Sequence, residues 1–269
     1  MSTECISTIK VDKDKCVGCN LCSTDCPMKI IEVKDNLARI LKEDCLKCGH
    51  CLSVCPKNAI TIEEYDMNEI IEGNIEKEHI DSDKLMKHLM LRRSVRQYTK
   101  IPVEREKIKK IIEAGRYTAT ARNRQNVRYI VIDRDINRLE DLGLKTFKKL
   151  SKLALPLSKV VKLPYDFSKM NIDRGFLFHE APAIILVVSS STLDAGLAST
   201  SMELMAESLG LGTLYVGLFT APANKSKEIR KLLKIEKNEK IVSCLALGYP
   251  DVKYYRSAPK KKANIMWSK

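Results

Sequence analysis

Long apolar segments are missing from this sequence of 269 residues. No run approaches the roughly 20 apolar residues that a membrane-spanning helix needs, and the amino terminus MSTECISTIK lacks the apolar stretch of a secretory signal. We therefore expect a cytoplasmic protein that does not contact a membrane. Aromatic residues make up only 6%, but 44% hydrophobic and 30% charged residues are typical of a globular chain and exclude a disordered or fibrous protein.

Cysteine is nearly absent from most of the chain. Eight of the ten cysteines lie between Cys16 and Cys55, Cys5 precedes them, and only Cys244 follows. Disulfides form in oxidising compartments, which nothing in this sequence indicates. Metal ligation is therefore the better interpretation of the cysteine block, whereas Cys244, within an apolar strand, is expected to be a small buried side chain.

The cysteine block contains the pattern C-x-x-C-x-x-C-x-x-x-C-P twice, over residues 16–27 and 45–56. Bacterial iron–sulfur proteins use this spacing, with three cysteines on one cluster and the fourth on the other. The predicted ligands of the first cluster are Cys16, Cys19, Cys22 and Cys55, and those of the second are Cys45, Cys48, Cys51 and Cys26.

Residues 5–65 as a whole resemble a bacterial 2[4Fe-4S] ferredoxin. Short strands are predicted over 30–33, 38–40 and 59–62. A pair of zinc sites is an alternative, because C-x-x-C pairs also bind zinc, and clusters that only hold the fold together are another. Two adjacent clusters favour electron transfer, since each passes one electron and the pair could hold two.

Positive charge is concentrated in the rest of the chain. Residues 1–66 hold nine Lys or Arg against eleven Asp or Glu, whereas residues 67–269 hold 38 against 23 and carry a net charge of +15. A basic surface attracts nucleic acid, anionic lipid, acidic proteins or phosphorylated ligands. No nucleic-acid-binding motif accompanies the charge, so we expect no nucleic-acid partner.

The sequence predicts a first domain over 1–66, a linker over 67–82 and an α+β domain over 83–269. In the last of these, helices are expected from Asp83, near Ile108–Gly115 and from Asp194 to Gly210, and strands over 128–132, 181–188, 215–219 and 241–250. Met86 and Met90 of the first helix are expected in the core. The run Arg92-Arg93-Ser94-Val95-Arg96 gathers three guanidinium groups and a hydroxyl, which suits a phosphate.

Five motifs follow one another along residues 83–269. They are the Arg-Arg-Ser-x-Arg run, Asn123-x-Gln125 before a strand, Asp194-x-Gly196-x-Ala198, Gly210-Leu211-Gly212, and Gly248-Tyr249-Pro250 followed by basic residues. In this order they resemble the nitroreductase family of FMN-dependent flavoproteins, here fused to an amino-terminal ferredoxin domain. The resemblance implies an α+β fold that forms a homodimer and binds FMN at the dimer interface.

The same resemblance implies roles for individual residues. It assigns Arg92, Ser94 and Arg96 to the FMN phosphate and ribityl chain, with Arg93 beside them, and Asn123 and Gln125 to the isoalloxazine ring. The backbone of Gly217 and Leu218 is expected at the flavin N5 edge, and Lys260 or Lys261, with Arg256, at the phosphate. No side chain is assigned as a catalytic acid or base.

These features predict an oxidoreductase that depends on FMN and on two 4Fe-4S clusters, which relay electrons to or from FMN for the reduction of a small organic acceptor. One alternative is a flavoprotein that oxidises NAD(P)H and passes electrons outward through the clusters to a protein partner, such as a ferredoxin or flavodoxin. Another is a non-catalytic iron–sulfur redox sensor.

Overall fold

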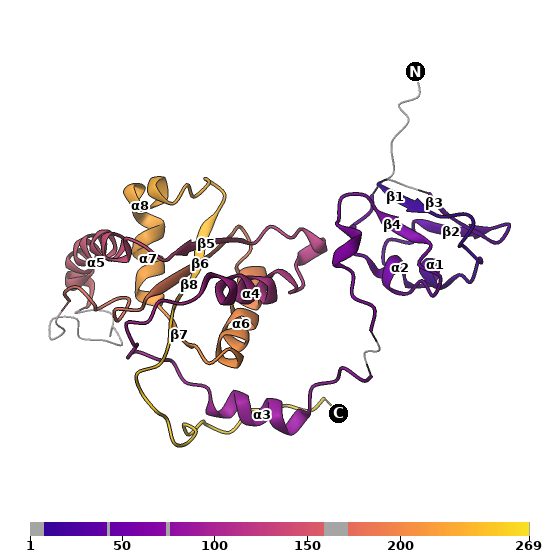
Figure 1. Ribbon diagram of the computed structural model, residues 1–269. Coiled ribbons are helices and arrows are strands. Elements are labelled where there is room, and N and C mark those ends of the chain that lie inside the picture. Colours follow the sequence, from indigo (N-terminus) through magenta and orange to yellow (C-terminus); the bar gives the residue numbers. More distant parts are fainter. Residues whose placement is uncertain (1–7, 42–43, 74–75, 159–171, 269) are drawn as a thin grey trace. The chain divides into compact units, whose positions relative to one another are not determined.

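The chain folds into two compact units in the computed structural model (Figure 1), which describes residues 8–41, 44–73, 76–158 and 172–268. The first unit comprises Met1–His79 and Thr120–Arg124, and the second comprises Ile80–Ala119 and Gln125–Lys269. The observed division thus falls after His79, so most of the predicted linker belongs to the first unit. Cys5 lies outside the described residues.

Two antiparallel strand pairs and two short helices form the first unit. Its elements are β1 (Ile9–Val11), α1 (Leu21–Asp25), β2 (Ile31–Lys34), β3 (Leu37–Ile40), α2 (His50–Ser53), β4 (Ile60–Ile62) and the 3-10 helices η1 (Met67–Glu69) and η2 (Ala121–Asn123). Strands β2, β3 and β4 correspond to the three predicted strands. Strand β2 pairs with β3, and β4 pairs with β1, a strand that was not predicted. Ile9, Ile31, Ile60 and Ile62 are buried between these pairs.

A four-stranded antiparallel sheet of order β5-β6-β8-β7 is the centre of the second unit. Its strands are β5 (Arg128–Ile132), β6 (Ala183–Ser189), β7 (Gly212–Tyr215) and β8 (Lys240–Gly248). The helices are α3 (Ser82–Leu91), α4 (Arg105–Arg116), α5 (Ile136–Ser158), α6 (Thr192–Ser208), α7 (Gly217–Lys225) and α8 (Lys227–Leu232). None of the described helices is both long enough and apolar enough to cross a membrane.

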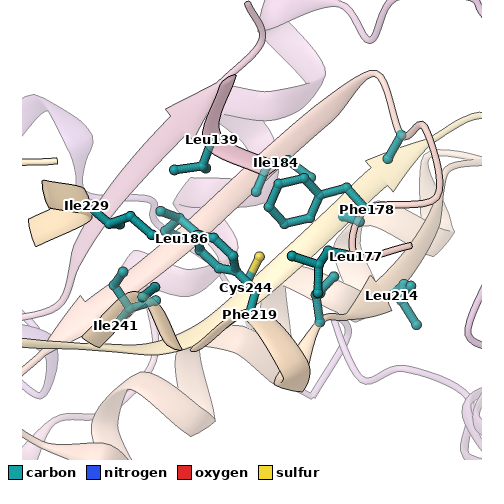
Figure 2. Packing of buried hydrophobic residues seen from close by; sticks show 14 of the residues in the cluster. Leu139, Leu177, Phe178, Ile184, Leu186, Leu214, Phe219, Ile229, Ile241 and Cys244 are labelled. Atoms are coloured by element: carbon teal, nitrogen blue, oxygen red, sulfur yellow. The ribbon is translucent and has the colours of Figure 1, made fainter. Parts of the chain in front are cut away.

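Every residue of β6 is buried, which explains its uninterrupted apolar sequence. Alternate side chains of a strand point to opposite faces. Ile184 and Leu186 therefore pack with α5, α7 and α8, whereas Ile185 and Val187 pack with α4 and α6. Helices thus cover both faces of the sheet. Figure 2 shows the first of these clusters, in which the sulfur of Cys244 lies among apolar side chains, as predicted for this cysteine.

Two expectations about the second unit are wrong. The predicted strand over 215–219 ends at Tyr215, and α7 begins at Gly217. In α7, Phe219, Pro222 and Ala223 are buried at helical spacing. A short apolar run does not distinguish a strand from a helix, because either element can be buried on all sides.

The second wrong expectation concerns α3. The helix begins at Ser82, one residue before the predicted start, and the Asp81 side chain accepts a hydrogen bond from the Lys84 backbone N–H at 2.7 Å. However, α3 buries none of its residues, and Met86 and Met90 are each 57% exposed rather than in the core.

Candidate functional site

The eight cysteines of the two motifs line two cavities in the first unit. One cavity is lined by Cys16, Cys19, Cys22 and Cys55, and the other by Cys26, Cys45, Cys48 and Cys51. Each cavity thus receives three cysteines from one sequence copy and the fourth from the other copy. The structure brings together the two ligand sets that the spacing predicted.

The loops around the two cavities share a backbone conformation. Gly18 and Lys47, at equivalent positions of the two copies, have φ of 64° and 51°, and Asn20 and Gly49 have φ of 66° and 77°. Left-handed residues of this kind bend a loop tightly, and Gly and Asn adopt the conformation most readily. At Gly18 a side chain is also excluded, because a Cβ atom would lie 2.6 Å from the Asn36 Cα.

Backbone N–H groups point at three of the sulfurs. Ala38 N lies 3.4 Å from Cys16 Sγ, Lys47 N lies 3.2 Å from Cys45 Sγ, and Ala59 N lies 3.4 Å from Cys55 Sγ. Hydrogen bonds to sulfur are one of the means by which a protein sets the potential of an iron–sulfur cluster. These donors favour sulfurs that carry negative charge.

Crowding of the thiols also bears on what the cavities hold. Burial, followed by the proximity of Cys45 and Cys48, raises the pKa of Cys51 to about 11, and burial also raises the pKa of Cys22. Metal cations offset both penalties, since coordinated thiols are deprotonated. Four thiols around each cavity, with backbone donors to their sulfurs, therefore fit a pair of 4Fe-4S clusters.

A second kind of site lies in the second unit, where the basic run meets the carboxyl-terminal tail. Arg92, Arg93, Ser94, Arg96 and Lys260 all line one cavity of about 690 Å³, a size typical of small-molecule sites. Its remaining lining residues are Leu89, Met90, Ser257, Ala258 and Pro259. The cavity combines several cations and a hydroxyl with an apolar wall, so it suits an anionic ligand with an apolar part.

Strand β7 holds the basic run in place. Ser94 forms a parallel bridge with Thr213, and Val95 N donates to the Thr213 carbonyl oxygen at 2.9 Å. Gly212 makes this approach possible, because a Cβ atom there would lie 2.7 Å from the Val95 Cβ. The Gly-Leu-Gly motif thus serves the packing of the basic run as well as ending α6.

The segment that follows strand β8 holds the residues after the run. Tyr98 bridges to Pro250, Thr99 N donates to the Tyr249 carbonyl oxygen at 2.9 Å, and Asp251 N donates to the Gln97 carbonyl oxygen at 2.9 Å. The buried Tyr98 hydroxyl donates to the Val95 carbonyl oxygen at 2.8 Å. Burial raises the pKa of Tyr98, so this hydroxyl stays a donor.

Glu203 is a site residue that the sequence analysis missed. Its carboxylate accepts a hydrogen bond from Arg92 Nη1 at 2.6 Å, and only 8% of its side chain is exposed. Burial raises the pKa of Glu203, although Arg92 and Thr213 act in the opposite direction. A signal was present in the sequence, because Glu203 is at helical spacing from the small residues Ala195, Ser199 and Ala206, and these residues share its buried face of α6.

The other predicted flavin contacts do not line the basic cavity. Asn123 belongs to the first unit, where its amide donates to backbone carbonyls, whereas Gln125 is an exposed residue of the second unit. Gly217 and Leu218 are the exposed first residues of α7. The tail residues Arg256 and Lys261 are exposed outside the cavity lining. Roles for these six residues at a flavin stay predictions.

Three features define the class of protein. They are an antiparallel sheet between two helix layers, a basic cavity at the edge of that sheet, and a cysteine-lined module. Residues 89–249 match the nitroreductase family, and residues 8–77 match the 4Fe-4S dicluster domain. The first match covers more than half of the chain. The chain therefore belongs to the nitroreductase family and carries an amino-terminal 4Fe-4S dicluster domain.

Individual relatives match about three fifths of the chain. An FMN reductase [NAD(P)H] of Bacillus subtilis is 30% identical over 177 residues, which are 62% of this chain and 66% of the relative. A putative NADH dehydrogenase/NAD(P)H nitroreductase of Archaeoglobus fulgidus is 26% identical over 62% of this chain and 86% of the relative. The chain thus spans slightly less than two thirds of the first relative.

Solved structures show the same fold. A nitroreductase with bound FMN from Bacteroides fragilis superposes with a TM-score of 0.55 at 19% identity, covering 69% of this chain and 99% of that one. A BluB-like flavoprotein from Clostridium difficile gives a TM-score of 0.53 at 22% identity, covering 66% and 94%.

The acid pair on α6 predicts a pH-dependent stability. Burial, with the nearby Glu203 charge, raises the pKa of Glu207 to about 7 although Arg92 lowers it. A carboxyl whose pKa is raised by folding stabilises the folded state below its unfolded pKa, and this contribution is lost as the pH rises through the folded value. We expect the free energy of unfolding to fall by about 1 kcal/mol between about pH 4.5 and 7, a value that allows for the partial exposure of Glu207. Denaturant unfolding followed by circular dichroism measures this change.

The variant Glu207→Gln should flatten this part of the stability profile. The matched control is Glu106→Gln, on the exposed side of α4 with an 82% exposed side chain, which should leave the profile unchanged. Parallel profiles for the wild type and Glu207→Gln would contradict the assignment to Glu207.

Proposed function

We propose that this protein is an oxidoreductase in which two 4Fe-4S clusters exchange electrons with FMN for the reduction of a small organic acceptor. The observation that carries the proposal is the presence, in one chain, of two cavities lined by four cysteines each and one cavity lined by Arg and Lys side chains. Family membership supports it, since two of the similar proteins are named as an FMN reductase and as a nitroreductase with bound FMN.

Bound FMN would supply hydride or single-electron transfer. The chain's part is to bind and orient it. Arg92, Arg93, Arg96 and Lys260 offer cationic donors for the phosphate, and the Ser94 hydroxyl offers a further donor. Leu89 and Met90 provide the apolar wall of the same cavity. The pair between Arg92 and Glu203 holds one guanidinium at the cavity wall.

The cysteines would hold the clusters in the sets observed around each cavity. Each cluster passes single electrons, so two of them in one small unit supply or remove the pair of electrons that a flavin exchanges. The N–H groups of Ala38, Lys47 and Ala59 stabilise the charge on the ligand sulfurs. This arrangement favours electron transfer over a purely structural role for the clusters.

A phosphate-specific prediction follows from the basic cavity. The double variant Arg96→Gln/Lys260→Gln should bind FMN about 10- to 100-fold more weakly, because charge-assisted hydrogen bonds contribute about 1.5 to 3 kcal/mol each and both side chains are partly solvated. Riboflavin, which has no phosphate, should bind with unchanged affinity. Flavin fluorescence titration of the flavin-depleted protein measures both.

The control for that titration is Lys231→Gln, which removes a cation from α8 in the same unit. Its affinity for FMN should match the wild type. An equal loss of riboflavin and FMN affinity in the double variant would contradict a phosphate site and indicate a general disturbance of the tail.

We also propose that the protein is a homodimer. The uncovered α3, on which Met86 and Met90 are exposed, and the tail residues Ile265, Met266 and Trp267, which are 62%, 95% and 84% exposed, support a self-association surface. Sedimentation equilibrium of the full chain should give twice 30.5 kDa. A mass of one chain at micromolar concentration would contradict the proposal.

The direction of electron flow decides between two forms of the enzyme. The leading form takes electrons in through the clusters, and the alternative oxidises NAD(P)H at the flavin and sends electrons out to a protein partner. The experiment is anaerobic: iron, sulfide and FMN are quantified, then cluster and flavin absorbance are followed after addition of either reduced ferredoxin or NAD(P)H. Flavin bleaching by reduced ferredoxin alone is expected.

Reduction of both kinds of centre by NAD(P)H alone would instead establish the alternative direction. A protein that contains eight iron atoms per chain but binds no FMN would contradict the proposed enzyme and leave the sensor interpretation. Names of the relatives from Bacillus subtilis and Archaeoglobus fulgidus include NAD(P)H, which is why this donor is tested.

A further inference from the structure

In the first unit, Asn123 forms hydrogen bonds that its expected role at a flavin does not explain. Its side-chain Nδ2 donates to the Lys47 carbonyl oxygen at 2.8 Å and lies 3.2 Å from the Leu46 carbonyl oxygen. Leu46 and Lys47 are the two residues between Cys45 and Cys48 in the second motif. The amide of Asn123 therefore binds the backbone of a cysteine loop.

The hydrogen bonds continue through one peptide group to a sulfur. The Leu46 carbonyl belongs to the same peptide as the Lys47 N–H, which donates to Cys45 Sγ at 3.2 Å. A donor at the oxygen of a peptide polarises it and strengthens the hydrogen bond made by its N–H. Asn123 thus acts on Cys45 Sγ through the peptide between Leu46 and Lys47.

The backbone at Lys47 needs such support. Lys47 has φ of 51°, a left-handed conformation that costs free energy for a residue with a long side chain. At the equivalent position the first copy has Gly18, which adopts it readily. The Lys47 carbonyl oxygen also accepts from the Tyr65 hydroxyl at 3.2 Å, and the Lys47 Nζ pairs with Glu64. The second loop is therefore held from outside, whereas the first relies on glycine.

The segment that carries Asn123 is itself strained. Arg122, Asn123 and Gln125 have φ of 55°, 52° and 49°. Three left-handed residues in four positions, none of them glycine, persist only where the surroundings hold them. Thr120–Arg124 belong to the first unit by their contacts. The Asn123 amide bonds to the Leu46 and Lys47 carbonyls and lies 3.4 Å from the Tyr65 hydroxyl, and its backbone N–H donates to the Thr120 carbonyl oxygen at 2.9 Å.

We infer that Asn123 is a positioning residue for the second cluster, the one predicted on Cys45, Cys48, Cys51 and Cys26, and that it raises the reduction potential of this cluster relative to the first. Hydrogen bonds to a ligand sulfur stabilise the more negative, reduced cluster. The Asn123 amide strengthens one such bond and fixes the loop that makes it. The inference rests on the proposed presence of a cluster in this cavity.

The test is a potentiometric titration of the full-length protein, with both clusters monitored by electron paramagnetic resonance. Asn123→Gly removes the amide but keeps a residue that tolerates the left-handed backbone. At a fixed ambient potential the reduced-to-oxidised ratio of one cluster should fall about two- to fourfold. The reason is that the charge-assisted hydrogen bond to Cys45 Sγ should lose about a tenth to a third of its strength. This is a shift of about 18 to 36 mV for a one-electron centre.

Two further variants sharpen the result. Asn123→Asp also tolerates the left-handed backbone but places a carboxylate oxygen against the two carbonyls, so its shift should be larger and in the same direction. The matched control is Asn68→Gly, whose amide and backbone N–H both donate to the Asp66 carboxylate in the same unit. Both clusters of the control should keep their wild-type potentials.

A second readout is hydrogen exchange of the Lys47 amide, which should become faster in Asn123→Gly. Selective loss of iron from one cluster in this variant, with the control intact, would also support the positioning role. Unchanged potentials in a variant with eight iron atoms, or equal shifts of both clusters, would overturn the inference. Fewer than eight iron atoms in the wild type would instead contradict the proposed function, so the two failures are distinguishable.

Discussion

Strand β8 is the element on which the second unit depends, because it pairs with β6 on one side and β7 on the other. The first pairing fixes the core, since alternate residues of both strands enter the two helix-covered clusters. The second places Thr213 of β7 where Ser94 and Val95 bind it. The chain after β8 then binds residues 97–99. One set of backbone hydrogen bonds therefore determines both the core and the edge that carries the basic run.

Electrostatics at this edge follow from the same packing. Several cations around one cavity repel each other unless anions compensate for them. The chain provides one anion of its own in Glu203, which is buried in α6 and paired with Arg92. A carboxylate in this position orients its guanidinium, and it leaves Arg93, Arg96 and Lys260 for an anionic ligand. Glu203 thus orients Arg92, whereas the other cations are available to attract a ligand.

The cysteine module shows how a sequence repeat becomes two unequal sites. Spacing alone makes the two cavities equivalent, and their left-handed loop positions coincide. However, one copy meets the backbone requirement with Gly18, whereas the other places Lys47 there and surrounds it with hydrogen bonds from Asn123 and Tyr65. The cost of a left-handed Lys is offset by contacts from outside the repeat. Equal ligand sets therefore have different surroundings.

The sequence by itself determined which cysteines share a cavity, because the repeated motif matches an iron–sulfur pattern in which the fourth cysteine of each copy binds the other cluster. It also determined most of the strands and helices from their periodicity. It also predicted an anion site at the basic run, whose residues line one cavity in the structure. Only the tertiary structure decided that α7 is a helix and that α3 is uncovered, since an apolar pattern does not say what packs against it. Likewise Glu203 and Asn123 acquired their partners from residues 111 and 76 positions away, respectively. Contacts at such separations depend on how the strands pair and the loops bend, and no local pattern encodes them.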